Sequence, residues 1–135
     1  MNRRVLVIVA HPDDEILGMG GTIAKYVAQG AEVALLIVTD GSTSQYKDAP
    51  DLQAIIEGKK LETKDAADIL GISKIYYGGQ PDMRLDVTAH TSVNAAIEKV
   101  VDDFQPDVVY THFEGDVNRD LWWYNKVVTG VANKI

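Results

Sequence analysis

The segment Val5–Gly21, VLVIVAHPDDEILGMGG, holds the residues of this chain that are best suited to chemistry. An apolar run leads directly into His11, and Asp13, Asp14 and Glu15 follow within four positions. Three adjacent carboxylates repel one another, and a divalent cation would offset that repulsion. Imidazole and carboxylate groups are ligands of hydrolytic zinc sites, so His11 and Asp14 are candidate metal ligands. Asp13, beside them, is a candidate general base for water at such a metal.

The same carboxylates also have a purely structural explanation. Acidic residues at the start of a helix favour its positive end and accept hydrogen bonds from its free N–H groups. This alternative accounts for Asp13, Asp14 and Glu15 but leaves the His-Pro pair at the end of the apolar run unexplained. The pattern therefore favours a metal site over a simple helix start.

Short apolar runs alternate with longer helical patterns along the chain, which is typical of βαβ units and a parallel sheet. Strands are expected over residues 4–9, 32–38, 74–77 and 107–111. Helices are expected over residues 16–29, 52–70, 88–104 and 121–133. The segments TDGSTSQYKDAPD and GGQPDMRLD are rich in turn-forming residues and are expected to be loops.

Right-handed crossovers would arrange these elements as a Rossmann-like three-layer α/β fold with the strand order 3-2-1-4. In such a sheet, ligands bind beyond the carboxyl ends of the strands, at the point where the strand order reverses. That point lies between the first and fourth strands, whose following loops are AHPDDE and THFEGDVNRD. Topology and chemistry therefore indicate the same edge of the sheet.

Two predicted helices carry apolar residues at helical spacing, and these residues are expected to face the sheet. In the helix over 88–104 they are Val93, Ile97, Val100, Val101 and Phe104. In the helix over 52–70 they are Leu52, Ile55, Ile56, Ala66, Ile69 and Leu70. The glycines Gly18, Gly20 and Gly21 do not form a G-x-G-x-x-G motif, so close helix–sheet packing explains them better than dinucleotide binding.

The composition narrows the classes of function. The 135 residues are 46% hydrophobic and 24% charged, which suits a single globular domain. The net charge of −7 argues against a nucleic-acid partner and against binding to an anionic membrane. The absence of cysteine excludes disulfides and thiolate metal sites. No apolar stretch reaches transmembrane length or resembles a complete signal peptide, so we expect a cytoplasmic protein.

Long segments of this chain resemble the LmbE/PIG-L-type zinc-dependent de-N-acetylases. The quite specific string AHPDDE opens the resemblance, which runs on through AEVALLIVTDG. It continues through KLETKDAADILGI, where Lys59 stands at a common arginine position and Glu62 keeps the acid, and through GGQPDMRLD and YTHFEGDVNRD. The resemblance covers nearly all of the chain and predicts one deacetylase domain over residues 1–135. We expect that domain to lack a C-terminal portion found in most family members.

The resemblance implies a metal-dependent hydrolase that removes the N-acetyl group of an N-acetylglucosamine-type (GlcNAc) derivative. His11 and Asp14 would bind the metal, which is expected to be Zn²⁺ or another divalent ion, and Asp13 would be the general base. The expected partners are a small N-acetylated sugar derivative and further copies of the chain in a homo-oligomer.

The sequence leaves the identity of the third metal ligand open. The family's second signature ends in Asp-His, whose histidine binds the metal, but Leu121 stands at that position here. His112 is a candidate ligand or oxyanion partner, or else a loop histidine bonded to the backbone. The alternative function is therefore a catalytically impaired metal-binding relative.

Four residues are candidates to contact the substrate. Asp40 follows the second strand and suits either a simple turn or the rim of a site. Asp82 and Arg84 lie in a loop from which they could reach sugar hydroxyls, and Asn118 stands where many relatives have another histidine.

Overall fold

The computed structural model describes residues 3–41, 48–80 and 90–112. In chain order its elements are β1 (Arg4–Val9), α1 (Asp14–Ala28), β2 (Glu32–Thr39), α3 (Leu52–Leu70), β3 (Lys74–Gln80), α4 (His90–Phe104) and β4 (Val108–Tyr110). The strands form a parallel sheet in the order β3-β2-β1-β4. The predicted α/β fold and its strand order are confirmed.

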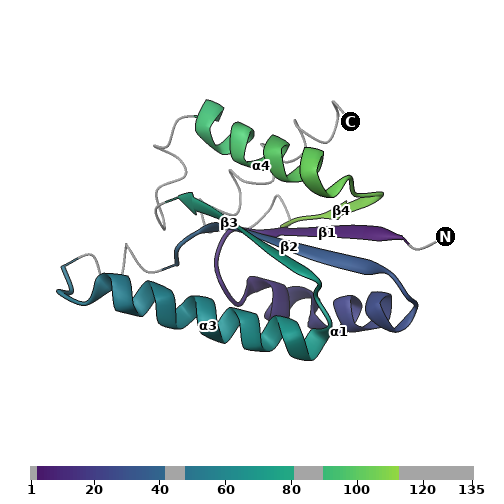
Figure 1. Ribbon diagram of the computed structural model, residues 1–135, viewed down its shortest axis with the longest axis horizontal. Coiled ribbons are helices and arrows are strands. Elements are labelled where there is room, and N and C mark those ends of the chain that lie inside the picture. Colours follow the sequence, from purple (N-terminus) through teal and green to yellow (C-terminus); the bar gives the residue numbers. More distant parts are fainter. Residues whose placement is uncertain (1–2, 42–47, 81–89, 113–135) are drawn as a thin grey trace.

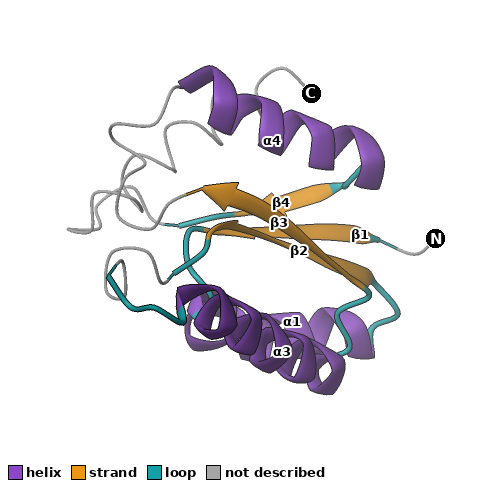
Figure 2. Ribbon diagram, turned by 60° about the vertical axis from the view of Figure 1, so that its left-hand side comes forward, coloured by secondary structure: helices purple, strands orange, loops and turns teal. Residues whose placement is uncertain are grey.

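Three layers make up the fold (Figure 2): α1 and α3 cover one face of the sheet and α4 covers the other. The two central strands, β1 and β2, are buried on both faces after their first residues. Their continuous apolar runs are what a parallel sheet between two helical layers requires. On the α4 side the core includes Leu6, Leu36 and Phe104. On the side of α1 and α3 it includes Val7 and Ile23.

Most element boundaries within the described residues agree with the prediction to within one residue, and two differ by more for local reasons. Helix α1 begins at Asp14 rather than residue 16, because the carbonyl of Asp13 accepts hydrogen bonds from the N–H groups of Ile16 and Leu17. Strand β3 extends to Gln80 into the predicted loop, because its carbonyl accepts the N–H of Asp40 at 3.0 Å. The helix predicted over 121–133 lies outside the described residues.

The predicted inner face of α4 is confirmed, since all five of its apolar residues are buried. The prediction for the inner face of α3 is partly wrong. Ile69 is 86% exposed, whereas Thr63 and Ala67, four residues apart, face the sheet. The packing argument for the α1 glycines is also wrong, because a Cβ atom added at Gly18 or Gly21 would meet nothing within 4 Å.

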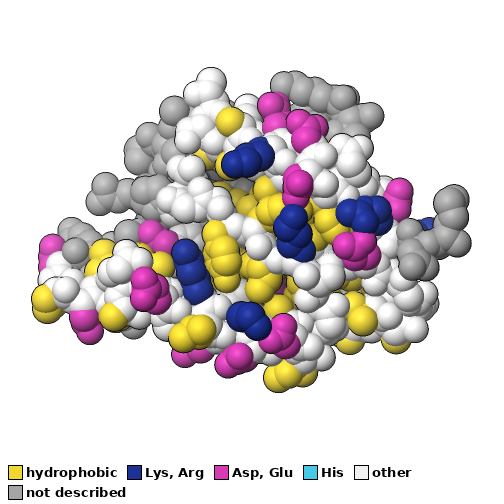
Figure 3. Space-filling view, in the orientation of Figure 1, with side chains coloured by type: hydrophobic (Ala, Val, Ile, Leu, Met, Phe, Trp, Pro, Cys, Tyr) yellow, Lys and Arg dark blue, Asp and Glu magenta, His cyan; other side chains and the backbone are white. Residues whose placement is uncertain are grey.

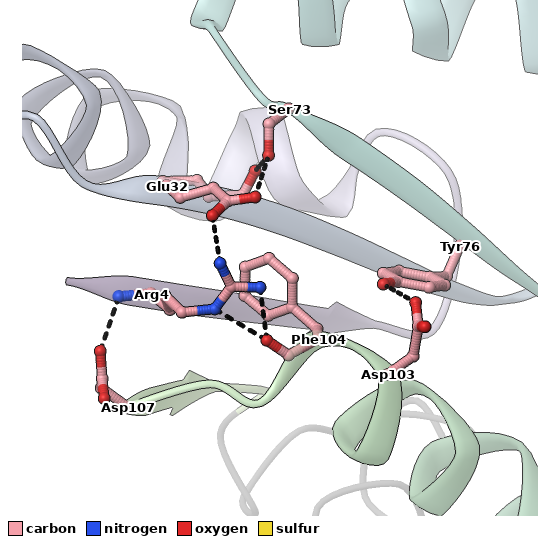
Figure 4. Close-up of polar contacts among 8 residues, drawn as sticks. Arg4, Glu32, Ser73, Tyr76, Asp103, Phe104 and Asp107 are labelled. Carbon is pink, nitrogen blue, oxygen red and sulfur yellow. Dashed lines mark hydrogen bonds and ion pairs between the residues drawn. The ribbon is translucent and has the colours of Figure 1, made fainter. Parts of the chain in front are cut away.

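The amino end of β1 is anchored by Arg4 (Figure 4). Its backbone N–H donates to the Asp107 carboxylate at 2.8 Å, and its guanidinium donates to the carbonyl of Phe104 from Nε at 2.8 Å and Nη2 at 2.6 Å. The guanidinium also pairs with Glu32 and lies over the ring of Phe104. These contacts join β1 to β2 and to the segment between α4 and β4. They lie at the end of the sheet opposite to the His-Pro-Asp-Asp turn.

No helix in the described part of the chain is long and apolar enough to cross a membrane.

Candidate metal site at the carboxyl ends of β1 and β4

The carboxyl ends of β1 and β4 meet as the topology predicts. The N–H of Ala10, the residue after β1, donates to Nε2 of His112 at 2.9 Å, although the two residues are 102 positions apart. From the other neighbouring strand, Thr39 donates to the carbonyl of Ala10 through its N–H at 2.9 Å and its hydroxyl at 2.8 Å. The residue directly before His11 is therefore held from both sides.

The turn from β1 into α1 has an unusual backbone. Asp13 has φ 83°, in the left-handed region that non-glycine residues seldom adopt and that is often found at functional sites. Asp13 occupies the N-cap position, but its side chain makes no capping hydrogen bond, and the residue is exposed. The carboxylate of Asp14 instead accepts the N–H of His11 at 3.1 Å. The helix-start explanation therefore does not account for the Asp13 side chain.

His11 and Asp14 lie at a separation that suits a shared metal ion. Nδ1 of His11 is 3.5 Å from Oδ2 of Asp14. Two atoms bound to one tetrahedral zinc at about 2.1 Å are about 3.4 Å apart, so the donor pair fits such an ion. Within residues 3–41, 48–80 and 90–112, no three His, Cys, Asp or Glu side chains are arranged to hold a metal together. Among the described residues, His11 and Asp14 are thus a pair of candidate donors without a third side chain grouped with them.

His112 lies beside this pair, but its Nε2 accepts a hydrogen bond from the backbone. Its Nε2 is 3.3 Å from Oδ2 of Asp14 and also accepts the N–H of Ala10. A ring nitrogen that accepts a hydrogen bond has no further lone pair for a metal, so the ring proton belongs on Nδ1. This geometry matches the predicted alternative of a histidine bonded to the backbone. Metal binding through Nε2 requires the bond to Ala10 to break.

The two carboxyl groups that flank this turn have opposite electrostatics. Burial by itself would raise the pKa of Asp14, but hydrogen bonds from His11, through its side chain and its N–H, hold that pKa well below its usual range. Asp14 is therefore ionised and ready to bind a cation. Burial, together with the nearby charges of Asp13 and Asp14, raises the pKa of Glu15. Glu15 is only 1% exposed, and its Oε2 has no hydrogen-bond partner among the described residues.

Beside the turn, Asp40 helps to line a cavity of about 20 Å³ with Pro12, Thr39 and Lys59. The space is far too small for a sugar, so the described residues around Asp40 do not form a substrate pocket. The other predicted substrate residues, Asp82, Arg84 and Asn118, lie outside the described residues, as does Leu121. Thr39 is not among the residues predicted from the sequence, although its place at the end of a buried strand beside this turn is a signal that points to it.

Comparison with known proteins shows the family of the chain. The family model PIG-L, described as GlcNAc-PI de-N-acetylase, matches residues 6–128. The chain belongs to this family. The match includes the AHPDDE turn and the end of β4, so the predicted resemblance to the PIG-L family is confirmed.

Several members of the PIG-L family, or proteins of its fold, are similar to most of this chain. The diacetylchitobiose deacetylase of Thermococcus kodakarensis is 34% identical over 107 residues, which are 79% of this chain and 39% of that protein. A probable N-acetyl-alpha-D-glucosaminyl L-malate deacetylase 2 of Bacillus cereus is 30% identical over 139 residues, covering 100% of this chain and 63% of that protein. The solved structure of N,N'-diacetylchitobiose deacetylase from Pyrococcus horikoshii has a TM-score of 0.85 at 27% identity, covering 97% of this chain and 49% of that chain. The chain thus spans about half the length of these relatives.

Proposed function

We propose that this chain is a zinc-dependent hydrolase that removes the N-acetyl group from a small GlcNAc-type derivative. The observation that supports this most directly is the separation of 3.5 Å between Nδ1 of His11 and Oδ2 of Asp14, next to the exposed carboxylate of Asp13. The names of the similar deacetylases support the substrate class, because each names an N-acetylated sugar derivative.

In the proposed site, His11 and Asp14 hold the cation, which supplies Lewis-acid activation of the amide carbonyl and acidifies water. Asp13 makes no capping bond to the helix, and its carboxylate is therefore available to take a proton from the attacking water. The same carboxyl, once protonated, can give its proton to the departing amine. Asp40, Asp82, Arg84 and Asn118 are proposed to contact the sugar.

We propose that His112 contributes to the site either as the third ligand or as support for the backbone at Ala10 that leads into His11. Its bond to Ala10 favours support, and its Nε2 lies at a ligand-like distance of 3.3 Å from Oδ2 of Asp14. The two roles differ in whether Nε2 of His112 leaves the N–H of Ala10 and binds zinc. The ¹⁵N signal of Nε2 should shift strongly on zinc addition only if that atom becomes a ligand.

The alternative function is a metal-binding relative with little or no turnover. Two observations favour it: Leu121 occupies the place of the family's ligand histidine, and the described residues offer two donors. Zinc binding without release of acetate would support this alternative over an active deacetylase.

Two substitutions test the proposed roles. His11→Ala should remove zinc binding measured by calorimetry, since one of two donors is lost. Asp13→Asn should leave zinc binding close to that of the parent while lowering acetate release from an N-acetylglucosamine derivative by about 10²-fold or more, as expected for loss of a general base. A parent that binds no zinc would contradict the metal site, and an active Asp13→Asn variant would contradict the role of Asp13.

We also propose that the chain forms a homo-oligomer through the edge of β3, which pairs with β2 alone among the described strands. Apolar grooves of about 550 Å³ and 730 Å³ flank this strand, towards α3 and α4 respectively. Figure 3 shows the apolar surface of these grooves, with lysines around it. The rims of the grooves carry lysines and carboxylates side by side, so the same edge on two copies would present both charges to each other.

A further inference from the structure

The peptide group that joins Ala10 to His11 is held on both of its sides. Its carbonyl oxygen accepts the hydroxyl of Thr39 at 2.8 Å and the N–H of Thr39 at 2.9 Å. Its N–H, which belongs to His11, donates to Oδ2 of Asp14 at 3.1 Å. Thr39 and Asp14 therefore bind opposite sides of one planar unit.

We infer that Thr39 is a positioning residue for Asp14 and acts through this peptide group. Because the peptide is planar, fixing the direction of its carbonyl also fixes the direction of its N–H. A carbonyl that accepts two hydrogen bonds polarises the amide, which strengthens the N–H as a donor. The hydroxyl of Thr39 thus both directs and strengthens the bond that holds the Asp14 carboxylate.

The surroundings of Thr39 suit this role. The residue ends β2, is 2% exposed, and has a β-branched side chain with few accessible rotamers. Away from water, its hydroxyl has no solvent competing for the hydrogen bond to Ala10. On the other side, the preceding peptide is held by His112, which accepts the N–H of Ala10. The backbone that presents His11 and Asp14 is therefore fixed by both neighbouring strands.

The effect on metal binding rests on the proposed function, whereas the coupling between Thr39 and the His11 N–H does not. The two parts can be measured separately. The first readout is the ¹⁵N–¹H signal of His11 in protein treated with chelator, which reports the hydrogen bond to Asp14. The second is the dissociation constant for zinc ion alone, measured by calorimetry.

Three variants make the test specific. Thr39→Val keeps the shape of the side chain and the N–H bond to Ala10 but removes the hydroxyl bond, and Thr39→Ser restores a hydroxyl. Thr63→Val is the matched control, because Thr63 is also 2% exposed, lines the same small cavity, and has no hydrogen bond to Ala10. Circular dichroism establishes that each variant is folded.

We expect Thr39→Val to move the His11 amide signal upfield and to weaken zinc binding about tenfold, as for other groups that orient metal ligands. Thr39→Ser and Thr63→Val should stay close to the parent in both measurements. An unmoved His11 signal in Thr39→Val would overturn the inference whatever the zinc result. If the signal moves but the parent binds no zinc, the coupling stands and the proposed metal site fails. If the parent binds zinc and Thr39→Val binds it equally well, the positioning role fails.

Discussion

At the scale of single residues, the turn after β1 places its four ionisable residues in three different environments. His11 and Asp14 face each other, Asp13 is exposed in a left-handed backbone conformation, and Glu15 is buried. Glu15 departs most from expectation, because a carboxylate at a helix start normally interacts with free N–H groups and water. Its burial next to two other carboxyl groups makes its ionisation unfavourable.

The raised pKa of Glu15 leads to a prediction about stability and pH. A carboxyl group whose pKa is higher in the folded chain stabilises the fold at low pH, and this contribution is lost as pH rises through the folded value. In metal-free protein, Glu15→Gln should therefore match the parent near pH 4 and exceed its melting temperature at pH 7. Thermal unfolding followed by circular dichroism at both pH values measures the difference.

The control for this prediction is Glu62→Gln, since Glu62 is exposed on α3. That variant should follow the parent at both pH values. A Glu15→Gln variant that is less stable than the parent at pH 7 would show that the ionised carboxylate has a stabilising partner.

At the scale of elements, the loop after β2 packs directly against the turn after β1. Gly41 has φ 66°, and a Cβ atom added there would lie 2.6 Å from Cδ of Pro12. Pro12 stands between His11 and Asp13, so the close approach of Gly41 limits where the turn that carries these residues can lie. The carbonyl of Gly41 also accepts a hydrogen bond from Lys59 at 3.4 Å, which connects this loop to α3.

Gly41→Ala should consequently damage both the fold and the site. We expect a loss of about 1–3 kcal/mol in the free energy of unfolding, from the left-handed backbone and the clash with Pro12. Zinc binding should weaken as well, because the turn that carries His11 and Asp14 has to move. Urea unfolding and zinc calorimetry provide the measurements.

A matched control adds the same methyl group at Gly18, on α1, where nothing lies within 4 Å. Gly18→Ala should stabilise the chain by about 0.5–1 kcal/mol, because alanine is the better helix former. Equal effects of the two substitutions would argue against a special role for the contact between Gly41 and Pro12.

At the scale of the whole molecule, the two ends of the sheet have different roles. The amino end is joined by Arg4 and its partners, whereas the carboxyl end holds the candidate metal site. The side edge at β3 is different again, since β3 pairs with β2 alone among the described strands. An edge strand with free backbone groups and apolar flanks is a site for association.

The proposed homo-oligomer predicts a mass in solution above the 14.8 kDa of one chain. Leu61 is 65% exposed and lines the groove beside β3, so Leu61→Lys should shift the protein towards the monomer in sedimentation experiments. Leu17→Lys is the control, because Leu17 is 86% exposed on α1 and does not line the grooves. A monomeric parent, or equal effects of both substitutions, would contradict association through β3.

Much of the fold and part of the site follow from the sequence alone. Alternating apolar runs and helical patterns predicted a parallel sheet, and the strand order brought the loops after β1 and β4 together. Such predictions succeed because strand and helix patterns are local, and because right-handed crossovers restrict the possible topologies. The pairing of His11 with Asp14 was accessible for the same reason, since three positions separate them at a strand-to-helix turn.

Tertiary structure alone decided where the long-range partners lie. The hydroxyl of Thr39 reaches Ala10 across 29 positions, and Nε2 of His112 reaches it across 102. Glu15 became buried and Ile69 exposed against the simple expectation for their types. The direction of each of these side chains depends on how the strands align and how the helices pack on the sheet, which no local pattern contains. The sequence thus determined which residues arrive at the carboxyl edge, and the packed structure determined which atoms meet there.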